Sequence, residues 1–111
     1  MFKLIFYDFK EIEAFMLSLR KKLAVKVEND FKLLEEYGNM LRMPHSEKLD
    51  DNIFELRVKQ GSDIVRVLYF FDKGRIIVVA NAYMKKKNKI DPSMLKKAND
   101  IRKQYYKKRG E

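Results

Sequence analysis

The chain has 111 residues, 46% of them hydrophobic, which is enough for one modest core, so we expect a single domain over residues 1–111. It contains no cysteine, which excludes disulfides, cysteine-ligated metals and cysteine nucleophiles. The net charge is +9 at pH 7 and no apolar run is long enough to cross a membrane, so we expect a cytoplasmic protein without a membrane anchor.

The N-terminal half predicts one strand and two helices. Residues 2–7 are rich in β-formers and predict a strand rather than a signal peptide. Asp8 and Glu11 have capping-box spacing and predict a helix start. The apolar residues that follow at helical spacing are Ile12, Phe15, Met16, Leu19 and Leu23. A second helix is predicted from about Val25 to Tyr37, and Gly38 suits the position just after its end.

A loop and a hairpin are predicted next. Residues 40–52 are predicted to be loop, and the loop holds the only histidine, His45. Two β-rich runs then flank Gly61-Ser62, a pair that suits the centre of a type II′ turn. This turn places Arg57 opposite Arg66. Because side chains alternate along each strand, one face of the hairpin is expected to face the core, and the opposite face is called the second face. The second face carries Glu55, Arg57, Lys59, Ile64, Arg66, Leu68 and Phe70.

The two facing arginines need an anion between them, because like charges directly across strands destabilise by roughly 0.2–1 kcal/mol. Glu55 is one candidate, and a bound phosphate, which the planar guanidinium matches, is the other. The hairpin alone leaves both interpretations open. If the anion is a phosphate, we expect Arg66→Ala to remove activity and to leave the fold intact.

The C-terminal third predicts a second tight turn, a strand and a helix. A two-residue turn at Lys73-Gly74 places Arg66 opposite Asn81, with Tyr83 on the same face; a bulge there would shift this register. Asp91-Pro92 then starts a final helix. Its apolar stripe is Leu95, Ala98, Ile101 and Tyr105. Residues 84–111 contain eleven Lys/Arg and three acids, +8 of the total charge, which indicates a polyanion partner or a solvated basic helix.

The order β-α-α-β-β-β-α predicts an α+β domain. We expect an antiparallel central sheet of about four strands with the helices packed on one face, and the second face free to bind a ligand. That free face would carry Arg57, Arg66, Asn81 and Tyr83, with lysines at its rim.

The residue types make cleavage of RNA feasible without a metal or cofactor. One histidine and scattered carboxylates give no metal site, and His45 is interpreted as a loop residue. RNA carries its own nucleophile, the 2′-hydroxyl, so a protein needs to position the chain and neutralise the phosphate. The candidate phosphate ligands are Arg57 and Arg66. Crowded lysines have lowered pKa values, so Lys85 or Lys86 is a candidate acid or base. The candidate RNA-binding residues are Lys59, Asn81, Tyr83, Lys87 and Lys89.

Several motifs together resemble the RelE/ParE toxin superfamily, specifically phage-derived HigB-like toxins. These motifs are FELR, RVLYFF eight residues later, a strand ending YMKKKNKID, and a basic helix ending RKQYY. The resemblance implies a RelE-like fold and the toxin of a type II toxin–antitoxin system that cleaves mRNA on the ribosome, leaving a 2′,3′-cyclic phosphate and a 5′-hydroxyl. It also implies a HigA-like helix-turn-helix antitoxin as partner.

The resemblance carries catalytic roles onto Arg57, Arg66 and the lysines at 85–87. The sequence departs from RelE at Glu55, where RelE has a basic residue, and it lacks RelE's tyrosine after the last basic strand residue. Tyr83 and the pair Tyr105/Tyr106 are candidate substitutes. The general base, codon preference and oligomeric state are left open.

Three other functions compete with the ribonuclease. The first is a ParE-like gyrase inhibitor, which needs no arginine pair. The second is a non-catalytic nucleic-acid-binding module that uses the basic C-terminal helix; here deletion of Met94–Glu111 abolishes affinity and Arg66 matters little. The third is purely structural, with Arg57 paired to Glu55 and a solvated lysine tail.

Overall fold

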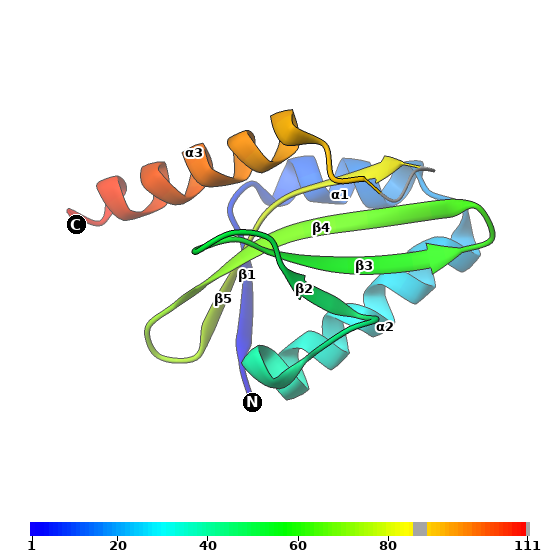
Figure 1. Ribbon diagram of the computed structural model, residues 1–111, viewed down its shortest axis with the longest axis horizontal. Helices are drawn as coiled ribbons and strands as arrows, with labels where there is room; N and C mark the ends of the chain where they lie inside the picture. The colour runs from blue at the N-terminus through cyan, green and yellow to red at the C-terminus, as the bar shows by residue number, and fades with distance from the viewer. Residues whose placement is uncertain (86–88, 111) are drawn as a thin grey trace.

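The computed structural model describes residues 1–85 and 89–110, which form one mixed sheet between two helical layers (Figure 1). The elements in chain order are β1 (Lys3–Phe6), α1 (Phe9–Ser18), α2 (Lys21–Tyr37), a 3-10 turn (Gly38–Met40), β2 (Ser46–Lys48), β3 (Phe54–Gln60), β4 (Asp63–Asp72), β5 (Ile76–Lys85) and α3 (Pro92–Lys108). The α+β class is as predicted.

The sheet has five strands in the order β1-β5-β4-β3-β2, so the prediction of about four antiparallel strands is wrong in two respects. Strand β1 joins the edge beside β5 and runs parallel to it, because the α1–α2 pair carries the chain back across the sheet before β2. The extra strand is β2, three residues within the predicted loop, paired with β3 from Phe54 to Leu56. Its polar sequence, Ser-Glu-Lys, gives no strand pattern.

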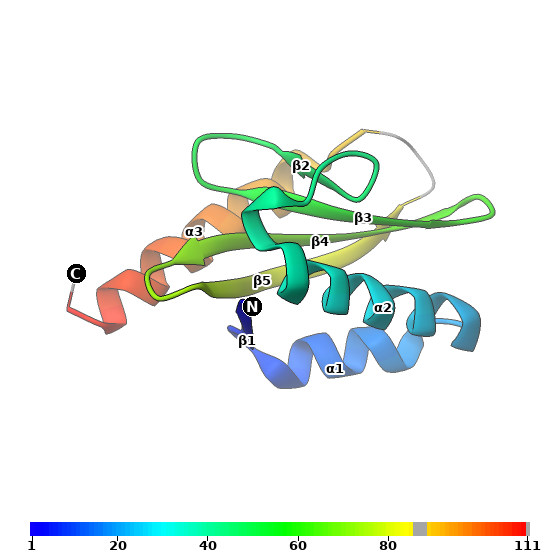
Figure 2. The same ribbon diagram turned by 90° about the horizontal axis from the view of Figure 1, so that it is seen from below.

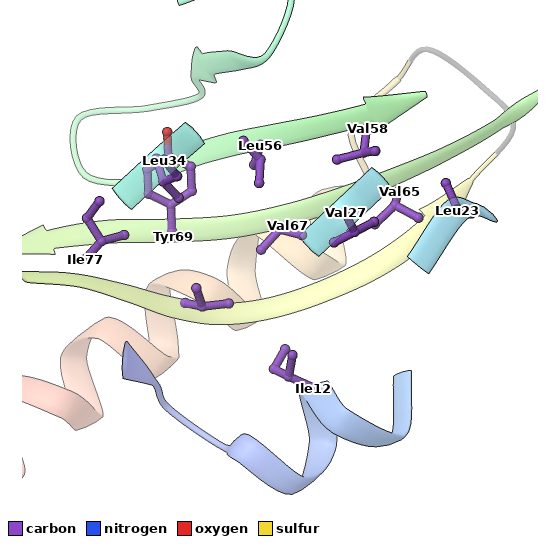
Figure 3. Close-up of a cluster of buried hydrophobic side chains, with 11 residues drawn as sticks. Ile12, Leu23, Val27, Leu34, Leu56, Val58, Val65, Val67, Tyr69 and Ile77 are labelled. Carbon is purple, nitrogen blue, oxygen red and sulfur yellow. The ribbon is translucent and has the colours of Figure 1, made fainter. Parts of the chain in front are cut away.

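Helices cover both faces of the sheet, which corrects the prediction that they share one face (Figure 2). Helices α1 and α2 pack on the predicted core face. The buried side chains of this cluster are shown in Figure 3; they include Ile12, Leu23, Val27, Leu34, Leu56, Val67 and Tyr69. On the other face, α3 packs through Ala98 against a second cluster with Leu68, Phe70 and Val78. The face expected to be free is therefore largely covered, because α3's apolar stripe needs an apolar partner.

The first hairpin has the predicted register. Gln60 pairs with Asp63, and Arg57 lies opposite Arg66. Of the two central turn residues only Gly61 has positive φ, +61°, as a type II′ turn requires.

The second hairpin differs from the prediction. Its loop has three residues, Lys73 to Arg75, between the paired Asp72 and Ile76, and the register shifts again between Leu68 and Tyr69. Arg66 therefore lies opposite Tyr83, and Asn81 lies opposite Leu68.

The helix starts follow from their caps. Asp8 precedes α1 and accepts a hydrogen bond of 3.1 Å from the Glu11 backbone N–H, and Asp91 precedes α3 with Pro92 in its first turn. Both starts are as predicted. Helix α2 begins at Lys21 rather than near Val25, so Leu23 belongs to α2 and not to the first helix.

Gly38 ends α2 in a conformation that other residues avoid, with φ of 50° and ψ of −121°. A Cβ at this position would lie 2.1 Å from the nearest ring carbon of Phe2. The Phe2 ring in turn packs edge-on against Phe71, so the helix end and the sheet meet at this glycine.

We expect Gly38→Ala to lower the free energy of unfolding by about 3 kcal/mol, because it adds backbone strain and displaces Phe2. Gly74→Ala is the matched control, since Gly74 also has positive φ but no neighbour within 4 Å of a Cβ. The control should cost only about 1 kcal/mol. Urea unfolding measures both, and equal losses would show that the close approach to Phe2 is unimportant.

Candidate active site

A buried carboxylate lies between the two arginines of the hairpin. Glu55 and Arg57 are two residues apart on β3 and share a face, and Arg66 lies opposite Arg57 on β4. Arg66 Nη1 donates to Glu55 Oε1 over 2.7 Å, and Arg57 donates to the same oxygen from Nε over 3.3 Å and from Nη2 over 3.2 Å. Glu55 has no exposed surface. The anion between the arginines in this structure is therefore Glu55.

Three of the residues predicted to contact RNA, Arg66, Asn81 and Tyr83, are buried on the sheet face that α3 covers. The side chain of Arg66 is only 1% exposed. Asn81 Nδ2 donates to the Met94 carbonyl in α3 over 3.2 Å. The Tyr83 hydroxyl accepts from the backbone N–H of Asp91 over 3.1 Å, and burial raises the pKa of Tyr83. These contacts attach the final helix to the sheet.

Arg57, in contrast, reaches the surface. Its side chain is 24% exposed, and Nη2 also lies 3.2 Å from Glu47 Oε2 on β2. The buried Glu55 carboxylate accepts hydrogen bonds from the Arg57 guanidinium, so the guanidinium keeps a fixed orientation at the surface. Arg57 is thus the member of the predicted arginine pair that a ligand can reach in this conformation.

A hollow of about 350 Å³ lies between α2 and β3 and is lined by Lys26, Asp30, Pro44, His45, Arg57 and Lys59. The backbone N–H of Arg57 donates to the His45 carbonyl over 2.8 Å, which fixes the two residues opposite each other. The Lys26 ammonium donates to the Lys59 carbonyl and connects α2 to the strand. Side chains alternate along β3, so those of Arg57 and Lys59 point to the sheet face opposite α2, the face that also carries Glu55 and Arg66.

An acid and an imidazole meet in this hollow. Asp30 is 8% exposed, and its Oδ2 lies 3.6 Å from His45 Nδ1. Burial raises the pKa of Asp30, and the nearby His45 and Lys26 offset part of that rise. A partly desolvated carboxylate beside an imidazole in a hollow is a candidate functional pair.

Sequence reasoning missed Lys26 and Asp30 and set His45 aside. Lys26 and Asp30 are four residues apart on α2, so they share one side of that helix. That spacing was visible in the sequence, but which strand α2 packs against was not. The one signal for His45 was its being the only imidazole in the chain.

A larger open groove continues from the hollow toward the first hairpin turn. Its volume is about 620 Å³, and it is lined by Lys21, Lys22, Val25, Lys26, Lys59, Gln60 and Gly61. The two depressions share Lys26 and Lys59. A cationic track of this kind attracts the backbone of a nucleic acid.

The predicted lysine rim is described only in part. Lys85 Nζ lies 3.1 Å from Asp91 Oδ2, so this lysine pairs with the residue that caps α3. Hydrogen bonds from Ser93 and Lys85 lower the pKa of Asp91 to about 2. Lys89 is exposed. Lys86 and Lys87 lie outside the described residues, so their predicted roles stay predictions.

Metal-binding clusters and membrane-spanning helices are both absent from residues 1–85 and 89–110. No group of three or more His, Cys, Asp or Glu side chains there is arranged to hold a metal ion. No helix in those ranges has the length and hydropathy to cross a bilayer.

Residues 14–103 match the profile of the family described as phage-derived protein Gp49-like (DUF891), which covers most of the chain. The chain belongs to the Gp49-like family. This is a family of RelE/HigB-like toxins, commonly the toxins of toxin–antitoxin systems. The search of curated proteins found no significant match. Membership of the Gp49-like family supports the predicted superfamily, whereas the HigB branch stays a prediction.

For this Gp49-like protein we expect Arg66→Ala to lower the free energy of unfolding by about 3–5 kcal/mol, because Glu55 would lose its closest cation while buried. This reverses the expectation that the fold survives loss of Arg66. The double change Glu55→Leu with Arg66→Met removes both charges and should recover most of the loss. Chemical unfolding measures the difference. Wild-type stability of Arg66→Ala would contradict the role of the buried pair.

Proposed function

We propose that this protein is the toxin of a type II toxin–antitoxin system and acts as a metal-independent endoribonuclease on mRNA at the ribosome. The observation that supports it most is the position of Arg57, whose guanidinium is held by the buried Glu55 and whose side chain is 24% exposed. Membership of the Gp49-like family supports the toxin assignment independently.

The proposed reaction needs a phosphate ligand more than a protein nucleophile. The 2′-oxygen of a ribose attacks the adjacent phosphorus, the bond from phosphorus to the 5′-oxygen breaks, and a 2′,3′-cyclic phosphate and a 5′-hydroxyl result. Negative charge grows on the phosphoryl oxygens during this step. A guanidinium fixed in a partly desolvated place stabilises that charge without first having to reorganise. Arg57 fills this role, and Lys59, two residues further along β3, shares its face.

The proposed partners follow from charge and family. A protein of net charge +9 associates readily with the polyanionic ribosome. A toxin of this family suggests an antitoxin partner, and the resemblance to HigB-like proteins indicates a helix-turn-helix antitoxin. An acidic segment of that antitoxin would complement the groove along α2 and β3.

A non-catalytic nucleic-acid-binding module is the second candidate, favoured by the exposed lysines on α3, among them Lys103 and Lys107. Deletion of Met94–Glu111 is not a fair test of this candidate, because α3 covers an apolar cluster of the sheet. The charge reversal Lys103→Glu with Lys107→Glu leaves that cluster intact and changes only the exposed side.

We expect Arg57→Ala to lower mRNA cleavage by about 10²–10³-fold and to remove toxicity, because one well-placed charge on the transition state is lost. Arg57→Lys should restore cleavage only in part, since an ammonium lacks the planar fork. Primer extension on cellular mRNA after brief induction measures cleavage, and urea unfolding checks the fold.

Two variants are the controls for Arg57→Ala. Lys73→Ala, in the exposed β4–β5 turn, should cleave like wild type. The reversal at Lys103 and Lys107 should cleave better than Arg57→Ala. Full toxicity of Arg57→Ala together with loss of toxicity in the α3 reversal would replace the ribonuclease with the binding module.

A further inference from the structure

We propose that a pocket beyond the C-terminal end of α2 binds a nucleotide, with the base against the Phe54 and Phe71 rings and the phosphate at the Arg42 and Lys48 cations. The pocket has a volume of about 390 Å³, a size typical of small-molecule sites. Its lining comes from the segment after α2 and from the strands β2, β3 and β4. This inference does not rest on the proposed ribonuclease function, because binding of a nucleotide involves no cleavage.

The strand side chains that line the pocket all leave the sheet on the face that α2 covers. Phe54 and Phe71 pack against the hydrophobic cluster of that face, which includes Tyr69. The Ser46 hydroxyl is hydrogen-bonded to the Tyr69 hydroxyl, so Ser46 points to the same face. Lys48 is two residues further along β2 and shares this direction. The geometry of the strands therefore brings two rings, one hydroxyl and one ammonium to a single surface.

The floor of the pocket is aromatic. The rings of Phe54 and Phe71 meet edge to face with centroids 5.0 Å apart, and Phe54 stacks on Tyr69 at 5.6 Å. Both phenylalanines are only partly buried, because α2 ends at Tyr37 and Leu41 forms a wall beside them. Aromatic side chains are a common contact surface for nucleic-acid bases, since every base presents a π-face.

The charged side chains that line the pocket are both cations. Arg42 and Lys48 are exposed, and no acidic residue is among the described residues of the lining. Arg42 Nη1 donates to the carbonyls of Asn39 and Leu41, the second over 3.2 Å. The Arg42 carbonyl accepts the Ser46 N–H over 3.2 Å. These bonds hold the guanidinium in place and do not use its Nε and Nη2 donors, which suit the oxygens of a phosphate.

A buried polar side chain also lines the pocket. Ser46 is 4% exposed, and its hydrogen-bond partner Tyr69 is 1% exposed. Burial raises the pKa of Tyr69 to about 12, so this hydroxyl keeps its proton at neutral pH. Two hydroxyls carry two protons, and the bond between them uses one. The second proton can be donated to an acceptor on the edge of a bound base.

These features together favour a flat ring with a polar edge and an attached negative charge. A nucleotide has all three properties. An acidic peptide with a phenylalanine has the ring and the charge, but its phenyl ring would place an apolar edge against the hydroxyl pair of Ser46 and Tyr69. Covering a polar group without a hydrogen-bond partner costs free energy. The pocket chemistry therefore fits a nucleotide better than such a peptide.

Adenosine 5′-monophosphate is the probe, and the methyl groups of Leu41 are the reporter, because Leu41 lines the pocket. We expect the probe to shift the Leu41 methyl signals in an NMR titration in a saturable way, since the ring current of a base acts only over short distances. Adenosine should bind about 10-fold more weakly, because it lacks the phosphate. Inorganic phosphate should leave the Leu41 signals almost unchanged, because it brings no ring.

Two substitutions test the two halves of the site. Phe54→Leu removes the ring and keeps an apolar side chain, so it should weaken binding of the probe by about 10-fold. Lys48→Glu reverses one exposed charge and should weaken binding by a similar factor, about 10-fold. Lys103→Glu is the matched control, with the same charge change on the exposed side of α3, and should bind like wild type. Urea unfolding establishes that each variant is folded, and Lys48→Glu decides if Phe54→Leu is not.

Four results would overturn the nucleotide site. They are the absence of a saturable Leu41 shift in wild type, unchanged affinity in folded Lys48→Glu, binding of adenosine as tight as that of the monophosphate, and an equal shift with inorganic phosphate. An acidic peptide containing phenylalanine is a further arm. If it shifts Leu41 where the monophosphate does not, the pocket is a peptide site instead.

The source of the nucleotide is distinguished with a pentaadenylate. Tighter binding than the monophosphate with the same Leu41 shift identifies one unit of an RNA strand as the ligand, whereas equal affinity identifies a free nucleotide. The pocket and the Arg57 guanidinium lie on opposite faces of the sheet, so the two proposals fail separately. If wild type cleaves mRNA and the probe gives no Leu41 shift, the pocket is wrong and the ribonuclease stands. If wild type cleaves no RNA with or without ribosomes, the ribonuclease fails and the Leu41 titration still decides the pocket.

Discussion

Glu55 is a carboxylate with no exposed surface in the middle of the sheet, and the arrangement of the molecule around it follows from its need for cations. Removing such a charge from water costs several kcal/mol unless hydrogen bonds and opposite charges offset it. Arg66 supplies the closest partner from β4, and Arg57 supplies two more donors from β3. The buried Glu55 carboxylate thereby holds Arg66 in the interior and orients the Arg57 guanidinium at the surface.

The final helix determines which of these charges a ligand can reach. Its apolar stripe covers Leu68 and Phe70 on the same sheet face that carries Arg66. Asn81 and Tyr83 serve as attachments for α3 and the segment before it. Of the two arginines that Glu55 binds, only Arg57 on β3 is then partly exposed. Helices α3 and α2 lie on opposite sides of the sheet (Figure 2), so the basic outer side of α3 is separate from the groove that α2 lines.

Local signals in the sequence predicted the parts of the fold that depend on neighbouring residues. The turn at Gly61 set the pairing of Arg57 with Arg66, and Asp8 and Asp91 set the starts of two helices. Each of these features depends on a few adjacent residues: a glycine that allows positive φ in a tight turn, or an aspartate that caps the start of a helix. The arginine pair and its two candidate anions, Glu55 and a phosphate, could therefore be predicted from the sequence. That Glu55 is the anion between the arginines is seen only in the structure.

The features that were missed depend on contacts between distant segments. Strand β2 is too short and polar to show the alternating pattern of a strand. It forms because Ser46–Lys48 pair with the edge of β3. The register shift at Leu68 depends on how β5 packs, and a two-residue turn was the simpler expectation. The hollow brings together Asp30 and His45, which only the docking of α2 on the sheet can make neighbours.

The central claim is that the RNA phosphate binds at the β3 edge through Arg57 and not on the sheet face beneath α3. A crystal structure of the protein with a short RNA made uncleavable by a 2′-O-methyl group tests this claim most directly. The account predicts a phosphate within hydrogen-bonding distance of the Arg57 guanidinium, with Arg66 still paired to Glu55. A phosphate bound to Arg66, with α3 displaced from the sheet, would contradict it.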